Sequence, residues 1–166
     1  MDVSSGERRQ ATGAVGAEVR VGFEDFFEAE HDRAVRRASL MLGDTDLAHD
    51  VVAAAMEQMW RRWDSIAEPG PYFHRCVVNG CRDVGRARSR VSLDDPPVNA
   101  ADSDEATVDL SLLLLELPFR QRAALVLRFY EGRTERQIAE ALNCRPGTVG
   151  PLISRGLQRL RKVMSE

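Results

Sequence analysis

Residues 117–164 contain the pattern that most constrains the fold: two short helix-forming runs with a tight polar turn between them, and then a basic run. The first run, residues 120–130, ends at a Glu-Gly pair. Thr134 with Gln137 forms a capping-box pattern at the start of the second run. Positive charge collects on the last run, residues 152–163. This arrangement is typical of a DNA-binding helix-turn-helix, so we expect one here.

The last run has an apolar side and a basic side, which favours a helix that packs on a core and faces a polyanion. Its apolar positions repeat at helical spacing: Val149, Ile153, Leu157 and Leu160. The net charge of −3 argues against a simple polyanion binder, but residues 108–166 hold ten basic against six acidic residues. The alternative interpretation is a helical hairpin whose basic face is only solvated.

Residues 22–90, the first module, contain three amphipathic helical patterns: residues 23–42, 46–66 and 71–88. Gly43 is placed to end the first of these helices, and Asp44 is placed to cap the second. Short connections between three such helices predict a small bundle. Residues 1–21 show little periodicity, so we expect them to form a disordered tail.

Residues 91–107 separate the first module from the second module, residues 108–166. They carry five acidic residues and a Pro-Pro pair but no Lys or Arg. Such a segment is expected to be a flexible, self-repelling linker. No strand-period alternation of useful length occurs in the sequence. The expected fold class is therefore all-α, with two small helical domains joined by a flexible acidic linker.

Patterns for catalysis and metal binding are not evident. The sequence has no nucleotide-binding loop, GxSxG or HExxH motif, and His74, Cys76 and Cys81 lack a standard zinc spacing. The three cysteines form no CxxC pair, no apolar run reaches membrane-spanning length, and no secretory signal is visible. We therefore expect a cytoplasmic protein with reduced thiols, without membrane insertion, enzyme activity, cofactor or metal.

Several motifs of the second module form a longer pattern: Leu117-Pro118, Tyr130-Glu131-Gly132, Gln137-Ile138-Ala139, Gly147-Thr148-Val149 and Ser154-Arg155-Gly156-Leu157. The pattern resembles region 4 of bacterial extracytoplasmic-function sigma factors, which belong to the sigma-70 family. In the first module, the run from Asp46 to Val52 with Trp60-Arg61 is similar to region 2.2 of that family. The Asn79-x-x-x-Asp83-x-x-Arg86 run is similar to its promoter-melting segment. A stand-alone helix-turn-helix repressor would not explain the first module.

The resemblance implies an initiation factor that binds core RNA polymerase and directs it to promoter DNA, with an anti-sigma factor as a further candidate partner. The second module would contact the −35 duplex through Thr134, Arg136, Arg145, Thr148, Arg155 and Arg159. The first module would hold the unpaired −10 strand through Asn79, Arg82, Arg86 and Arg88. It would dock on the polymerase through Asp50, Met56 and Trp60.

Two sites depart from the family pattern. Ala53 and Ala54 stand where the family usually carries Gln and an acidic residue, and Gly150-Pro151 stands where it usually carries basic and polar DNA contacts. A proline inside the recognition helix would cost about 3 kcal/mol and a glycine up to about 1 kcal/mol, so we expect the helix to begin at Pro151. Both departures predict weakened function. The alternative is a divergent sigma-like regulatory protein that acts through protein–protein binding.

Overall fold

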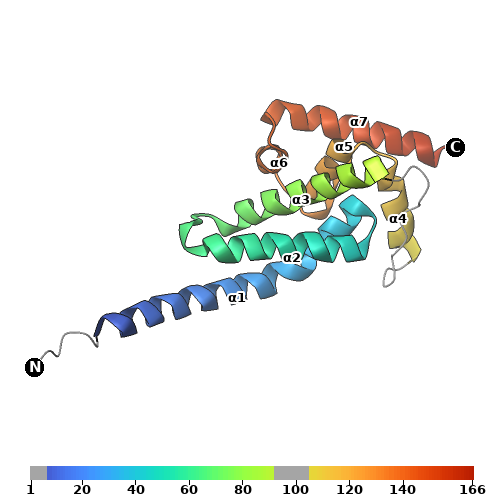
Figure 1. Cartoon of the computed structure of the whole chain (residues 1–166). Helices are drawn as coiled ribbons and strands as arrows, with labels where there is room; N and C mark the ends of the chain where they lie inside the picture. Colours follow the sequence, from blue (N-terminus) through green and yellow to red (C-terminus); the bar gives the residue numbers. More distant parts are fainter. Residues whose placement is uncertain (1–6, 92–104) are drawn as a thin grey trace, which may run out of the picture.

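The computed structural model describes residues 7–91 and 105–166, with side chains from residue 22 to 88 and from 110 onward, and all the described elements are helical (Figure 1). The first module contains α1 (Glu7–Leu42), α2 (Thr45–Arg62), the 3-10 helix η1 (Trp63–Ser65) and α3 (Pro69–Val91). The second module contains α4 (Glu105–Leu115), α5 (Phe119–Leu125), the π-helix η2 (Val126–Tyr130), α6 (Glu135–Leu142) and α7 (Pro146–Met164). The expected all-α fold with two helical domains is confirmed.

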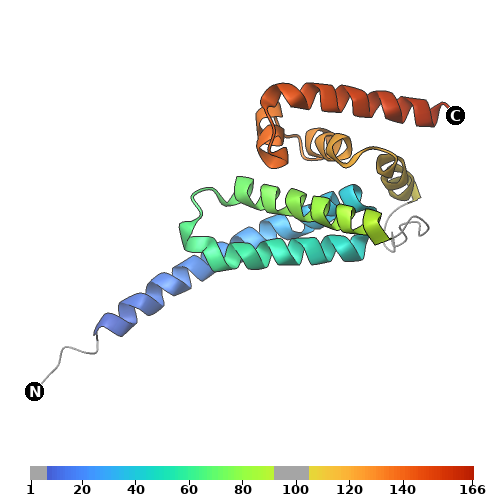
Figure 2. The ribbon, with the colours of Figure 1, turned by 45° about the horizontal axis from the view of Figure 1, so that its top comes forward.

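Helices α1, α2 and α3 form the bundle of the first module (Figure 2). Their facing sides are apolar and fully buried, with Met41 of α1, Met59 of α2 and Phe73 of α3 at the centre. The turn between α1 and α2 is tight because Gly43 adopts a φ of 65°. The carboxylate of Asp44 then accepts a hydrogen bond from the backbone N–H of Leu47 at 3.0 Å. The predicted helix end and N-cap are both confirmed.

Helix α1 extends further toward the N-terminus than the sequence predicts. It begins at Glu7 and projects beyond the bundle (Figures 1 and 2), whereas the sequence predicts a disordered tail over residues 1–21. Residues 7–11 are good helix formers, which is consistent with this extension. Residues 1–6 and 92–104 lie outside the described residues, so the flexible acidic linker stays a prediction.

Helices α6 and α7 form the helix-turn-helix of the second module. The hydroxyl oxygen of Thr134 accepts from the N–H of Gln137 at 3.2 Å, and the side-chain oxygen of Gln137 accepts from the N–H of Thr134 at 3.0 Å, so the predicted capping box is confirmed. Asn143, with a φ of 51°, ends α6 in the left-handed region. Helix α7 crosses α5 closely at Gly156, where an added Cβ would lie 3.0 Å from Cδ1 of Leu125.

The predicted start of the last helix is wrong. Helix α7 runs from Pro146 to Met164, so Pro151 lies inside it. Arg145 is the N-cap and Pro146 takes the first helical position, where proline is favoured. As the sixth helical residue, Pro151 forfeits only the backbone hydrogen bond to the carbonyl of Gly147, which is itself exposed near the end of the helix. The recognition helix is therefore not shortened.

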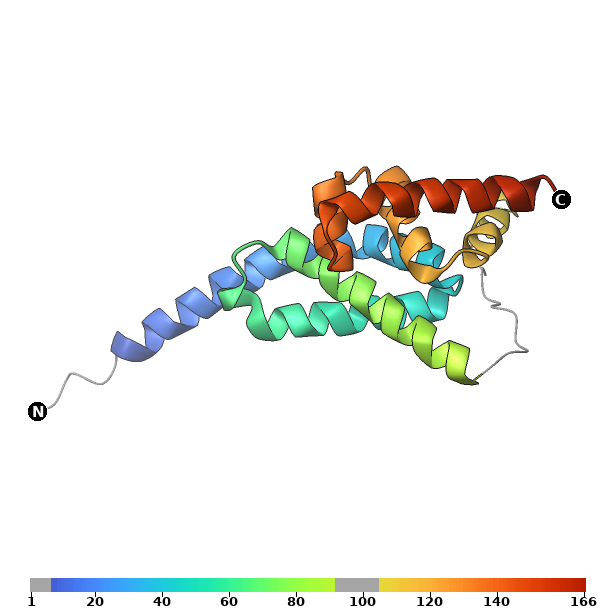
Figure 3. The ribbon, with the colours of Figure 1, turned by 90° about the horizontal axis from the view of Figure 1, so that it is seen from above.

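The two modules pack against each other (Figure 3). Helix α6 lies on α3, while α4, α5 and η2 contact α1. The approach is close at Gly43, where an added Cβ would lie 2.5 Å from Cδ1 of Leu115. Buried apolar residues of both modules form one continuous cluster, so the described residues make a closed arrangement of the two modules.

Candidate nucleic-acid interface

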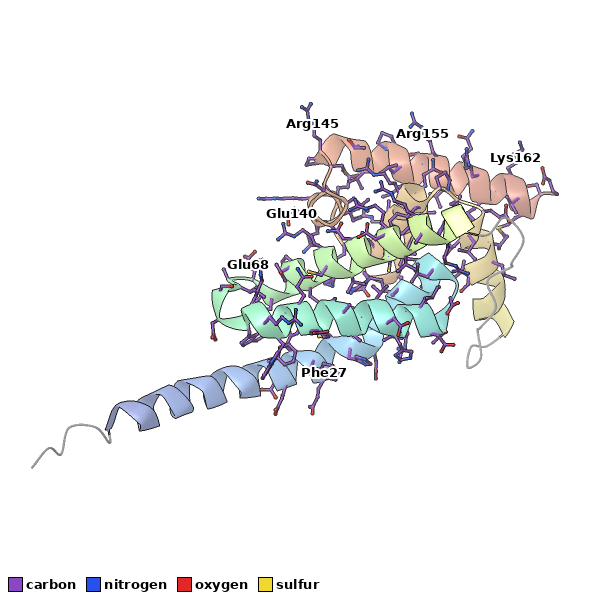
Figure 4. All side chains as sticks on the ribbon, viewed as in Figure 1. Phe27, Glu68, Glu140, Arg145, Arg155 and Lys162 are labelled. Atoms are coloured by element: carbon purple, nitrogen blue, oxygen red, sulfur yellow. The ribbon has the colours of Figure 1, made fainter. Side chains whose placement is uncertain are left out.

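The outer face of α7 carries four exposed polar residues: Arg145, Thr148, Arg155 and Arg159. Their spacing of three, seven and four residues places them on one side of the helix. Figure 4 shows Arg145, Arg155 and Lys162 pointing away from the rest of the molecule. With a rise of 1.5 Å per residue, α7 spans about 28 Å. This face can follow the phosphate backbone of a duplex.

The other two predicted −35 contacts, Thr134 and Arg136, lie at the start of α6 and are also exposed. The hydroxyl oxygen of Thr134 accepts the capping bond, and its O–H remains available as a donor. The Nε of Arg136 lies 3.8 Å from a carboxylate oxygen of Glu140, an exposed pair that contributes little stability. Arg136 can therefore exchange this carboxylate for a phosphate. The structure places all six predicted −35 residues on the surface of the helix-turn-helix.

The exposed face of α7 that is predicted to contact DNA is interrupted at Pro151. This exposed residue stands three positions after Thr148 and four before Arg155, so it occupies the middle of the same face. Its ring offers no hydrogen-bond donor and no charge. The weakened −35 contact predicted from the sequence therefore depends on missing polar side chains at residues 150–151, because the helix itself is intact.

The predicted −10 contacts lie on α3, but they differ in exposure. Arg86 is exposed, whereas Asn79 and Arg82 are half-buried. Arg88 donates a hydrogen bond to the carbonyl of Leu42 at 3.2 Å, at the C-terminal end of α1. In this conformation Arg88 supports the packing of α3 on α1 and does not project with the other three residues.

A cleft of about 1050 Å³ separates the basic face of α3 from the second module. Arg82 and Arg86 line one side of this cleft, and Arg120 and Arg122 line the other. Arg120 also donates to the carbonyl of Leu142 at 3.2 Å, and burial lowers the pKa of Arg122 from its ordinary value. Arg120 and Arg122 are not predicted as site residues from the sequence, because nothing in their local pattern indicates that they face α3.

The predicted polymerase contacts on α2 occupy two different environments. Asp50 is exposed, and Trp60 is 42 % exposed. Met56 is only 4 % exposed and belongs to the core, so it stabilises the bundle and cannot reach a partner while the module is folded. Ala53 and Ala54 are exposed on the same helix, so this surface carries no polar side chain at these two positions.

An ionic cluster with a buried centre joins the two modules, and the sequence does not predict it. The side chains of Arg37 on α1 and Glu131 after η2 are 0 % and 1 % exposed, and Nη1 of Arg37 lies 3.2 Å from Oε1 of Glu131. The guanidinium groups of Arg33 and Arg133 lie 3.5 and 3.7 Å from Oε2 of Glu131. Arg133 also lies 2.7 Å from Nε2 of His74 on α3. We call these five residues the Glu131 cluster.

Electrostatics within the Glu131 cluster fix the protonation of its histidine. Burial, with the positive charges of Arg37, Arg133 and Arg33, lowers the pKa of His74 to about 3, so the neutral ring accepts a hydrogen bond from Arg133. Burial also lowers the pKa of Arg37, and the charge of Glu131 opposes that shift. One sequence signal was available, since Arg37 occupies an inward position of the apolar stripe of α1.

The described residues offer no metal site: no group of three or more His, Cys, Asp or Glu side chains is placed to hold an ion. Among the described helices, none combines the length and apolar character needed to cross a membrane. Burial raises the pKa of the Cys81 thiol to about 12. This thiol is therefore protonated and packs as a small apolar group.

Comparison with known protein families assigns both modules. Residues 26–91 match the Sigma-70 region 2 family, and residues 107–160 match the Sigma-70, region 4 family. The chain is 31 % identical over 149 residues to the RNA polymerase sigma-E factor of Streptomyces avermitilis, covering 84 % of this chain and 83 % of that protein. It is 28 % identical over 155 residues to the ECF RNA polymerase sigma factor SigM of Mycobacterium tuberculosis, covering 87 % and 78 %.

Two solved structures share the fold. The sigma factor RpoE of Bartonella quintana, in complex with the anti-sigma factor NepR, is similar with a TM-score of 0.70 and 22 % identity over 86 % of this chain and 98 % of that chain. CnrH, in complex with the cytosolic domain of CnrY, is similar with a TM-score of 0.67 and 21 % identity, covering 88 % and 89 %. With matches to region 2 and region 4 in order, the chain belongs to the extracytoplasmic-function group of sigma-70 family RNA polymerase sigma factors.

Proposed function

We propose that this sigma factor places the −35 duplex along α7 and the unpaired −10 strand along α3. The observation that carries the first assignment is the exposed face of α7, formed by Arg145, Thr148, Arg155 and Arg159 within the region 4 match. Arginines at this spacing can bind phosphates, and the residues near the start of the helix can reach base edges in the major groove. Thr134 and Arg136 add contacts at the start of α6.

The −10 strand is assigned to Asn79, Arg82 and Arg86 within the region 2 match. Arginine side chains can hold the phosphates of an unpaired strand, and the amide of Asn79 can both donate to and accept from a base edge. Arg88 joins this set only if its bond to the carbonyl of Leu42 is released.

We assign polymerase docking to the outer face of α2, where Asp50 supplies a charge and Trp60 an exposed aromatic surface. A partly exposed tryptophan is a common anchor of protein interfaces. Because Ala53 and Ala54 add no polar contact, we expect docking to depend strongly on Trp60. Since the protein acts with RNA polymerase, we place it in the cytoplasm.

An anti-sigma factor is a further partner that we propose, since the similar RpoE structure contains one. A groove of about 260 Å³, formed by the second module and Leu40 of α1, could accept its apolar side chains, and Phe129 in this groove is 66 % exposed. Exposed apolar patches of this kind mark interaction sites. The groove is lined by Leu40, Leu110, Leu114, Leu125, Val126, Phe129, Tyr130, Leu157 and Leu160.

Run-off transcription with purified core polymerase and a promoter library tests the proposal. We expect initiation from a subset of promoters, and we expect Trp60→Ala to reduce it together with polymerase binding. Polymerase binding without initiation would favour the alternative, a sigma-like regulator that acts through protein contacts. A protein that binds neither polymerase nor promoter DNA would contradict both functions.

A further inference from the structure

The strongest unassigned feature is the contact between Arg37 and Glu131, because it crosses from one module to the other. Both side chains are almost fully buried, at 0 % and 1 % exposure, and their charged atoms are 3.2 Å apart. Charged residues are seldom buried to this extent unless they are paired. Arg37 therefore depends on the other module for its ion-pair partner, and separation of the modules would return both charges to water.

The remaining members of the Glu131 cluster tie further elements to the same carboxylate. Arg33 reaches it from α1 at 3.5 Å and Arg133 reaches it from the second module at 3.7 Å. Arg133 then contacts His74 of α3 at 2.7 Å. One carboxylate thus stands among three guanidinium groups, and removing its charge would leave positive charges facing one another across the boundary between the modules.

A second contact of the same boundary involves the C-terminal end of α1. Arg122 of α5 donates a hydrogen bond to the carbonyl of Met41. A positive side chain at this end also complements the helix dipole. The second module therefore holds α1 at two places, the Glu131 cluster and the end of the helix.

This closed arrangement covers the proposed −10 surface. Asn79 and Arg82 of α3 share a cavity of about 440 Å³ with Glu140 and Asn143 of the second module. Both α3 residues are only half-buried, so the second module lies over them without filling the space. A strand that binds Asn79 and Arg82 would have to displace α6 from this position.

The charges along the adjacent cleft oppose closure. Arg82 and Arg86 on α3 face the same space as Arg120 and Arg122 of the second module. Like charges that face one another repel, and the repulsion favours a separated arrangement or an added polyanion. The Glu131 cluster adds to the Arg122 contact and to the shared apolar cluster in opposing this repulsion, so loss of the Glu131 charge shifts the balance toward the open arrangement.

We propose that Glu131 is the centre of a latch between the two modules, which keeps the −10 surface of α3 covered until the modules separate. The latch rests on the proposed function for the identity of that surface. Neutralising Glu131 opens the molecule and exposes Asn79 and Arg82, while the face of α7 is unaffected. The first test concerns conformation only, so it can fail or succeed independently of transcription.

The first experiment is small-angle X-ray scattering of the full-length chain, of Glu131→Gln and of Glu116→Gln. Glu116 is an exposed residue of the same module, so it controls for the lost charge. We expect a larger radius of gyration for Glu131→Gln alone, with unchanged helical circular dichroism. An unchanged radius for a folded Glu131→Gln, or an unmodified protein already as extended as the variant, would overturn the proposal.

A double variant keeps the proposal testable if Glu131→Gln fails to fold. In Arg37→Met with Glu131→Met, two apolar side chains of similar length replace the buried pair, and such replacements are often neutral or stabilising. We expect this variant to fold and to be as compact as the unmodified protein. If the double variant were extended, pairing of these two buried charges would not be what keeps the modules together, and the latch as described would be overturned.

The second experiment measures binding of a fluorescein-labelled pyrimidine oligonucleotide, used as a single-strand probe, by fluorescence anisotropy. If about a tenth of the free protein is open, full opening by Glu131→Gln lowers the apparent Kd about tenfold. Adding Arg82→Ala and Arg86→Ala should remove this gain. An equal Kd for the unmodified protein and Glu131→Gln, or a gain that survives loss of both arginines, would overturn the covering of α3.

Discussion

The basic faces of α3 and α7 differ in their surroundings more than in their composition. On α7, Arg145, Arg155 and Arg159 are exposed along the outer side of the helix. On α3, Asn79 and Arg82 lie half-buried beneath the second module. Duplex contact therefore requires no rearrangement of the described residues, whereas single-strand contact requires the modules to part. Under the proposed function, the closed molecule limits single-strand contact by α3 and leaves duplex contact by α7 available.

The largest expected effect comes from removing a buried charge that holds the two modules in the closed arrangement. Arg37→Met removes the fully buried partner of Glu131 and leaves Arg33 and Arg133, at 3.5 and 3.7 Å, beside the carboxylate. Breaking a buried ion pair costs up to about 3–5 kcal/mol. We expect the free energy of unfolding in urea to fall by this order. Arg36→Met, on the exposed side of the same helix, is the matched control. Equal unfolding midpoints for the two variants would show that the Glu131 cluster does not stabilise closure.

Acid should lower the stability of the folded, closed molecule through protonation of His74. The pKa of this ring is about 3 in the folded molecule, against an ordinary value of about 6.5 in the unfolded chain. Because folding lowers the pKa, the unfolded chain binds more protons between these values. The stabilisation is complete above about pH 6.5 and decreases as the pH falls toward 3, with a loss of about 2 kcal/mol at pH 5.

Thermal unfolding at pH 7.5 and pH 5 measures this effect. His74→Gln is the control because its side-chain oxygen can still accept from Arg133 but does not titrate in this range. We expect the unmodified protein to lose more stability at pH 5 than His74→Gln does. An identical pH dependence would show that protonation of this ring does not oppose closure.

On the exposed outer face of α7, single substitutions should change duplex binding alone. Arg155→Ala removes one phosphate contact from α7, so the slope of log affinity against log salt for duplex DNA should decrease by about 1. Binding of a single strand should not change. Arg161→Ala, off the exposed stripe, is the comparison variant. A similar loss for both variants would show that duplex contact is not confined to this face.

The smallest expected effect is a gain in duplex affinity when polar side chains are restored at residues 150–151 of the same face. Gly150→Lys with Pro151→Ser adds one positive charge and one hydroxyl where the helix already presents its outer side. We expect the salt slope for duplex binding to increase by about 1, measured by mobility-shift titration. Circular dichroism should confirm that α7 remains helical. No gain from a folded variant would contradict the assignment of residues 150–151 to the DNA-contacting face.

Local patterns predicted the second module well. The capping box at Thr134 and the apolar stripe through Val149 depend on neighbouring residues, and both appear in the structure. The start of α7 was predicted wrongly because the full penalty of an interior proline was assigned to Pro151. Because Pro151 lies close to the exposed end of the helix, it loses only one backbone hydrogen bond, and the unpaired carbonyl of Gly147 can be hydrated.

The contacts between the modules could not be predicted in the same way. Arg37 and Glu131 lie 94 positions apart, and the pairing of two domains is not encoded in a local period. The inward position of Arg37 on α1 indicated a buried charge but not its partner. Met56 shows the converse case, since the family resemblance suggested a polymerase contact for it and the structure puts it in the core.

The proposed latch controls access to α3 and not access to α7, and a paired titration distinguishes these two effects. Unmodified protein and Glu131→Gln are titrated with a single-stranded oligonucleotide and with a −35 duplex taken from the promoter library, at the same salt concentration. The account predicts that Glu131→Gln binds the single strand about tenfold more tightly and binds the duplex with unchanged affinity. Equal changes in both affinities, or no change in the first, would contradict it.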